Sequence, residues 1–192
     1  EKTKIFIKKR IYICFLIRYN DSIIQKHTLV KRKSKNGERT PFMKKISFIV
    51  IGAGNRGAKY SRYAISNPDK MEIVGVAEPI KARRESMRDQ FHIPEENCFS
   101  DWSEILARPK MADAAIISTQ DQMHYEPAMR AIELGYHLLL EKPMSHRPEE
   151  CVAIAKAAEE KGVHVIIGHV LRYAPFFTAL RNVIASGRIG KV

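Results

Sequence analysis

Hydrophobic residues along the chain gather in short, nearly continuous runs, which are typical of strands buried on both faces. Five such runs predict strands at residues 45–51, 71–77, 112–118, 136–140 and 163–168. The longer stretches between them predict helices from the turn after Ile51 to about Ser66, and at residues 81–91, 125–134, 148–161 and 175–186. A further short helix is expected to open near Ser100, with Ser100 as its N-cap.

Strands and helices therefore alternate along the chain, with short connections between them. This alternation builds βαβ units, in which consecutive strands lie parallel in one sheet and the helices cover both faces. Glycines placed just past the predicted helices, such as Gly135, Gly162 and Gly187, are typical of helix C-terminal ends. The pattern predicts an α/β fold with a parallel sheet.

The composition is that of a chain able to form a core. Of the 192 residues, 45% are hydrophobic and 28% are charged, unlike a disordered segment. No apolar run approaches the roughly 18 residues of a membrane-spanning helix, which excludes an integral membrane protein. The three cysteines Cys14, Cys98 and Cys151 show no Cys-x-x-Cys spacing, which speaks against a disulfide framework or a zinc site. We predict a cytoplasmic protein with no metal.

The positive charge is concentrated at one end. The net charge is +12, but residues 1–42 hold 12 basic and 3 acidic residues, and the rest holds 21 and 18. Because the body of the chain is only mildly basic, nucleic acid is not predicted as a partner. Residues 1–42 are interpreted as a basic extension outside the fold, with Met43 as the natural start. A genuine basic arm and a targeting segment are the alternatives.

A glycine-rich turn follows the first predicted strand directly. Residues 52–57 read Gly-Ala-Gly-Asn-Arg-Gly, a G-x-G-x-x-G pattern that opens a helix within a βαβ unit. Gly52 permits a tight turn, Gly54 lets the backbone approach a pyrophosphate, and Gly57 lets the helix pack closely on the strand. The helix start favours the anion. The pattern predicts a dinucleotide site, with a purely structural turn as the alternative.

An acidic residue ends the second predicted strand. Glu78 lies 26 residues after Gly52, where a carboxylate can bind both hydroxyls of an adenosine ribose and repel a 2′-phosphate. Arg83 and Arg84 follow closely and would soften that preference. NAD is the predicted cofactor, with NADP as the alternative.

Glu141, Lys142 and Pro143 follow the predicted strand at 136–140. They therefore lie at the carboxyl edge of the sheet, where ligands bind in open α/β folds. A lysine facing that crevice could carry acid/base chemistry. The alternative is a surface salt bridge between Glu141 and a neighbour.

Four segments together resemble the glucose-fructose oxidoreductase / inositol dehydrogenase / MocA family. They are the glycine-rich turn, the loop Thr119-Gln-Asp-Gln-Met-His124, the tripeptide Glu141-Lys-Pro143, and Gly168-His-Val-Leu-Arg-Tyr-Ala-Pro175. The resemblance covers about residues 44–192. Gln120 stands where the family usually has proline. The resemblance implies a Rossmann-type doubly wound parallel sheet followed by a second α/β domain with an open, mostly antiparallel sheet, which is truncated here.

The resemblance also implies roles for individual residues. Lys142 would be the catalytic lysine that bonds the reacting hydroxyl, and Glu141 would hold the nicotinamide end of the cofactor. The cofactor-binding set implied by the motifs and the resemblance is Gly52, Gly54, Asn55, Arg56, Gly57, Glu78, Ser118, Thr119, His124, Glu141, Lys142 and Arg172. His169 and Tyr173 would lie on the substrate side, although His169 could equally be a structural histidine at a strand end.

The function implied is that of an NAD(P)-dependent oxidoreductase acting on a sugar, cyclitol or related polyol. An NAD-dependent glycosidase of the same fold, a non-catalytic dinucleotide-binding module and a nucleic-acid binder are the alternatives. Residues 43–170 would form the dinucleotide-binding domain, and residues 171–192 a connecting helix and the start of the second domain. The full-length protein is expected to form a homo-oligomer, and this chain alone is expected to be inactive.

Overall fold

The computed structural model describes residues 45–191, so the predictions for residues 1–42 lie outside the described part of the chain. Within it, all strands join one sheet in the order β3-β2-β1-β4-β5-β6, and every neighbouring pair is parallel. This is the expected Rossmann-type α/β sheet. The strands are β1 (Ile46–Ile51), β2 (Met71–Ala77), β3 (Cys98–Phe99), β4 (Ala114–Ile117), β5 (His137–Leu140) and β6 (Val165–Ile167).

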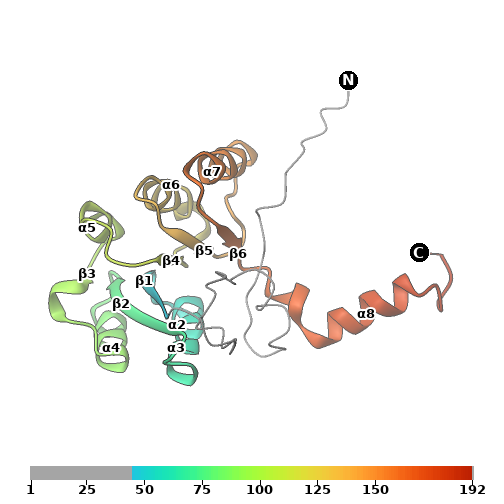
Figure 1. Ribbon diagram of the computed structural model, residues 1–192, viewed down its shortest axis with the longest axis horizontal. Coiled ribbons are helices and arrows are strands. Elements are labelled where there is room, and N and C mark those ends of the chain that lie inside the picture. The colour runs from blue at the N-terminus through green and yellow to red at the C-terminus, as the bar shows by residue number, and fades with distance from the viewer. Residues whose placement is uncertain (1–44, 192) are drawn as a thin grey trace, which may run out of the picture.

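Helices cover both faces of this sheet (Figure 1). The α-helices are α2 (Asn55–Ser61), α3 (Tyr63–Ser66), α4 (Lys81–Phe91), α5 (Trp102–Ala107), α6 (Tyr125–Glu133), α7 (Pro148–Lys161) and α8 (Pro175–Ala185). Three short 3-10 helices lie at η1 (Glu95–Asn97), η2 (Asp121–Met123) and η3 (Val170–Tyr173). Helices α2, α3 and α4 lie on one face and α5, α6 and α7 on the other, whereas α8 projects away from the body of the molecule (Figure 1).

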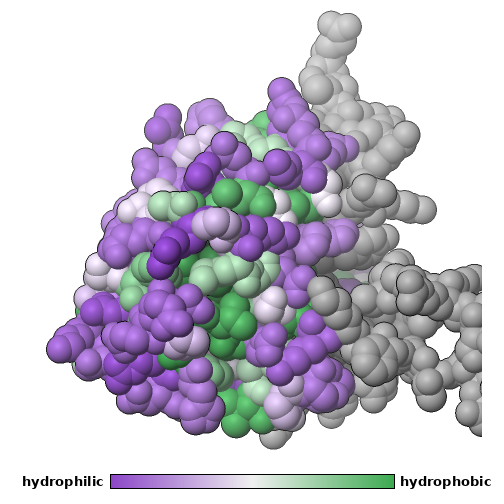
Figure 2. Space-filling view, turned by 60° about the vertical axis from the view of Figure 1, so that its left-hand side comes forward, coloured by the Kyte–Doolittle hydropathy of each residue, from purple (hydrophilic) through white to green (hydrophobic). Residues whose placement is uncertain are grey.

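The core forms two layers, one on each face of the sheet. In β1, Ile49 and Ile51 pack against the layer under α5, α6 and α7, whereas Val50 packs against the layer under α2, α3 and α4. This alternation follows because successive side chains of a strand point to opposite faces. On the face seen in Figure 2, many side chains are hydrophilic, and hydrophobic ones show between them. Burial on both faces explains why the strands read as nearly continuous apolar runs.

The predicted N-cap of α5 was wrong. The N-cap of α5 is Asp101, whose side chain accepts a hydrogen bond from the Ser103 N–H at 2.8 Å. The Ser100 hydroxyl donates to the Glu104 carboxylate instead. The helical stretch expected to run to about Ser66 does end at Ser66. It divides into α2 and α3 at Arg62, where the Ile65 N–H bonds to the Arg62 carbonyl only three residues back. The short strand β3 was not predicted.

The strand order places a crevice at one edge of the sheet. The chain leaves β1 toward β2 on one side and later returns to β4 on the other side of β1. In open α/β sheets, ligands bind outside the carboxyl ends of the strands at such a reversal. Backbone pairing extends one residue past the strands there, since Ser118 N–H donates to Ile51 and Glu141 N–H donates to Ile117. The strand order therefore brings the segments after β1, β4 and β5 to one place.

Candidate functional site

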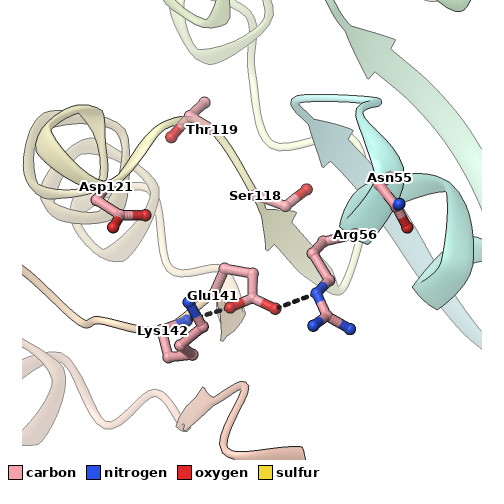
Figure 3. A pocket seen from close by; sticks show the side chains of 7 residues that line it. All are labelled: Asn55, Arg56, Ser118, Thr119, Asp121, Glu141 and Lys142. Carbon is pink, nitrogen blue, oxygen red and sulfur yellow. Dashed lines mark hydrogen bonds and ion pairs between the residues drawn. The ribbon is translucent and has the colours of Figure 1, made fainter.

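A cavity of about 190 Å³ opens at this carboxyl edge (Figure 3). Its lining comes from the start of α2, the residues after β4, the first residue of η2 and the residues after β5. The lining residues are Asn55, Arg56, Ser118, Thr119, Asp121, Glu141 and Lys142. Six of the seven are among the site residues predicted from the sequence. Asp121 is not, and its place between Thr119 and His124 in the loop motif was the signal that could have identified it.

The three glycines of the turn have different surroundings. Gly52 has a φ of +86°, and a Cβ there would lie 2.7 Å from the Ser118 carbonyl oxygen. A Cβ on Gly57 would lie 2.1 Å from the Gly52 carbonyl oxygen. Around Gly54, by contrast, the nearest atom is a guanidinium nitrogen of Arg83 at 3.9 Å. Packing therefore requires glycine at 52 and 57, whereas glycine at 54 leaves space beside the loop for a ligand.

Glu78 is buried at the end of β2, with 4% of its surface exposed. Its Oε2 accepts a hydrogen bond from the Ala53 N–H at 2.7 Å, and its Oε1 accepts one from the Ile80 N–H at 3.0 Å. The carboxylate thus ties the glycine-rich turn to β2. Because each carboxylate oxygen has two lone pairs, acceptor positions remain for ribose hydroxyls. Arg84 turns away from the carboxylate and donates to the Glu78 backbone carbonyl.

Glu141 lies between Arg56 and Lys142 (Figure 3). Its Oε1 is 3.5 Å from Arg56 Nε, and its Oε2 accepts a hydrogen bond from the Lys142 backbone N–H at 2.5 Å. Only 5% of Glu141 is exposed, so its ion pair joins a buried carboxylate to the half-exposed guanidinium of Arg56. The Tyr60 hydroxyl, which was not predicted as part of the site, also donates to Oε1. Burial, followed by this hydrogen bond, raises the pKa of Tyr60.

His124 is fully buried and is not among the residues that line the cavity. Its Nδ1 lies 2.7 Å from the Pro143 carbonyl oxygen and its Nε2 lies 3.3 Å from the Thr119 carbonyl oxygen. His124 therefore connects the loop after β4 with the loop that carries Lys142. Lys142 is held on both sides, by Glu141 at its own N–H and by His124 at the next residue.

Three other predicted residues lie in the segment after β6. His169, Arg172 and Tyr173 are exposed and are not part of the cavity lining. Tyr173 is 43% exposed. Their roles stay predictions.

Within residues 45–191, the structure shows neither a metal-binding cluster nor a membrane-spanning helix. No three His, Cys, Asp or Glu side chains among these residues are grouped so that they could hold a metal ion. No helix in this part of the chain is long and apolar enough to span a membrane.

The model of an oxidoreductase family with an NAD-binding Rossmann fold, Gfo/Idh/MocA, matches residues 46–169. The chain belongs to this family. The NAD-binding fold of the Gfo/Idh/MocA family agrees with two features of the site. The space beside Gly54 fits a pyrophosphate, and the carboxylate of Glu78 fits a ribose.

Several known proteins are similar to this chain. A scyllo-inositol 2-dehydrogenase (NAD(+)) from Bacillus subtilis is 30% identical over 142 residues, which are 74% of this chain and 41% of the relative. A 2,7-anhydro-N-acetylneuraminate hydratase from Escherichia coli is 28% identical over 148 residues, which are 77% of this chain and 38% of the relative. The chain therefore spans about two fifths of the length of these Gfo/Idh/MocA proteins.

A solved structure shows the same fold. The WlbA dehydrogenase from Chromobacterium violaceum, in complex with NADH and UDP-GlcNAcA, superimposes with a TM-score of 0.69. It is 22% identical, and the match covers 77% of this chain and 41% of that protein.

Proposed function

We propose that the protein is an NAD-dependent oxidoreductase that transfers a hydride between the cofactor and a CH–OH group of a sugar, cyclitol or related polyol. The observation that carries the proposal is the position of Lys142. It lines the cavity together with Asn55 and Arg56, which belong to the glycine-rich motif, and buried groups hold its backbone on both sides. The inositol dehydrogenase among the relatives supports the substrate class.

Different residues would bind different parts of the cofactor. The turn at residues 52–57 would hold the pyrophosphate, and Glu78 would accept hydrogen bonds from the adenosine ribose. Glu141 and Arg56 form the wall between the turn and Lys142, where the nicotinamide end would lie. When bound, NAD supplies the hydride acceptor at that end.

Lys142 would act on the substrate. Its side chain is exposed at the cavity, so its Nζ can reach a hydroxyl presented there and hold the proton that leaves as hydride is transferred. Loss of the hydroxyl proton together with hydride converts the CH–OH group to a carbonyl. Fixing the backbone of Lys142 limits the positions that Nζ can take, which is the source of the rate gain expected from a positioned group.

The test compares Lys142→Ala with the wild type in the full-length protein. We expect the rate of NADH formation from polyols to fall about 100-fold or more, the scale typical of a positioned acid/base group. NAD affinity, measured by calorimetry, should stay nearly unchanged because the glycine turn and Glu78 are intact. Lys156→Ala serves as the control, since Lys156 is an exposed lysine on α7.

Two outcomes would contradict the proposal. One is an unchanged rate in Lys142→Ala, which would remove Lys142 from the chemistry. The other is conversion of substrate by the wild type without net NADH formation. That result would favour the alternative of an NAD-dependent glycosidase, in which the cofactor is reduced and then re-oxidised.

A further inference from the structure

A buried hydroxyl–carboxylate pair lies behind the cavity wall. The Tyr60 hydroxyl in α2 donates to Glu141 Oε1 at 2.5 Å, although 81 residues separate the two in the chain. Tyr60 is 2% exposed and Glu141 is 5% exposed. Tyr60 does not line the cavity, whereas its hydrogen-bond partner Glu141 does, so Glu141 connects the hydroxyl to a ligand bound there.

The two oxygens of Glu141 have different neighbours. Oε1 faces the Tyr60 hydroxyl and Arg56, whereas Oε2 accepts the backbone N–H of Lys142. Burial and the neighbouring carboxylate raise the pKa of Tyr60, so the phenol keeps its proton and remains a donor. Because a phenol has a single O–H, this hydrogen bond selects one orientation of the carboxylate.

Gly168, directly after β6, closes the space around the pair. A Cβ at this position would lie 2.9 Å from the Tyr60 hydroxyl oxygen and 3.3 Å from Glu141 Cδ. Its N–H donates to the Leu140 carbonyl, which fixes its backbone beside the residue that precedes Glu141. The pair is thus enclosed by α2, the end of β5 and the end of β6, and the hydroxyl has little room to move.

We infer that Tyr60 is a positioning residue for the nicotinamide end of the site. Its hydroxyl holds the Glu141 carboxylate in the orientation that keeps Arg56 on one side and the Lys142 backbone on the other (Figure 3). The inference rests on the proposed function, in which this end of the cavity receives the nicotinamide. It assigns Tyr60 a role in cofactor affinity without any contact to the cofactor.

The test separates the two ends of the dinucleotide. Tyr60→Phe removes only the hydroxyl, and its affinities for NAD and for ADP-ribose, which lacks the nicotinamide, are measured by calorimetry. We expect NAD affinity to fall about tenfold, the scale of one hydrogen bond to a charged group. ADP-ribose affinity should stay within about twofold, because the turn at residues 52–57 and Glu78 are untouched. Tyr63→Phe, a nearby tyrosine outside the pair, should change neither affinity.

Gly168→Ala provides an independent arm. The added methyl group would displace the Tyr60 hydroxyl, so this variant should also lose NAD affinity selectively. In the Tyr60→Phe background the methyl group can occupy the space of the missing oxygen, and the second substitution should then add little. Selective, non-additive losses support the inference.

Other results would overturn it. An equal loss of NAD and ADP-ribose affinity in Tyr60→Phe would mean that the tyrosine only supports the fold, and unchanged NAD affinity would mean that Glu141 does not need the hydroxyl. If the wild-type chain bound neither ligand, the proposed function would fail first, and the inference with it.

Discussion

At the scale of single residues, one glycine of the turn is needed for packing and another for ligand binding. Gly54 has open space where Gly57 has the Gly52 carbonyl oxygen. We therefore expect Gly54→Val to abolish NAD binding while the thermal unfolding transition stays close to that of the wild type. Gly57→Ala is the matched control and should destabilise the fold, because its Cβ would overlap the Gly52 carbonyl. Calorimetry and thermal unfolding check both variants, and a Gly54→Val protein that binds NAD normally would refute the dinucleotide site.

Glu78 determines a second prediction. Its carboxylate would bind the ribose hydroxyls and repel a 2′-phosphate, so Glu78→Ser should narrow the difference between the affinities for NAD and NADP. The guanidinium nearest to Gly54 belongs to Arg83 and would then attract the phosphate without opposition. Titration with both cofactors measures the ratio. A variant with the wild-type ratio would show that another residue reads the ribose.

Single residues also show where sequence reasoning stops. Lys142 and the glycines could be predicted because their motifs follow strands directly, and the ends of parallel strands meet at one edge. The role of Tyr60 could not be predicted, because its hydrogen bond joins residues 81 positions apart. A tyrosine in an amphipathic helix is predicted to be a core residue. His124 was placed in the cofactor-binding set, but a sequence motif does not distinguish a residue that lines the cavity from one that supports its wall.

At the scale of elements, the cap of α5 can be tested. Asp101 accepts the Ser103 N–H, whereas the Ser100 side chain only bonds to Glu104. Replacing an N-cap of this kind by alanine costs about 1 kcal/mol of stability. We expect Asp101→Ala to lower the free energy of unfolding, measured in urea, by about this amount. Ser100→Ala should lower it much less. A reversed order of the two variants would restore Ser100 as the cap.

The bounds of helices and strands were predicted correctly where neighbouring residues in the sequence determine them. The helices at 81–91 and 148–161 and the strand at 71–77 have the predicted bounds, because turn residues, prolines and glycines mark their ends. The strand expected at 112–118 is shorter, Ala114–Ile117, because the register with β1 and β5 covers these four residues. Beyond them, Asp113 and Ser118 keep only single backbone hydrogen bonds to β1. Such limits depend on neighbouring strands, and a two-residue strand such as β3 leaves no periodic pattern.

At the scale of the whole molecule, the excess positive charge and the candidate site lie in different parts of the chain. The residues of the candidate site lie between Gly52 and Tyr173, whereas most of the excess positive charge lies in residues 1–42. We therefore expect a chain shortened to residues 43–192 to bind NAD with the affinity of the 192-residue chain. Calorimetry of both forms at the same salt concentration checks this. Weaker binding by the short form would show that residues 1–42 take part in binding.

The strand order also has a consequence for biosynthesis. The first described strand, β1, lies in the middle of the sheet and requires both β2 and β4 as neighbours. About 60 residues separate the end of β1 from the start of β4; at about 5–20 residues per second, a ribosome needs about 3 to 12 seconds to make them. During that interval one edge of β1, a strand that is apolar except for Ser47, has no partner, and such an edge can pair with another chain. We therefore expect this edge of β1 to stay open to pairing with another chain until β4, which ends at Ile117, has emerged.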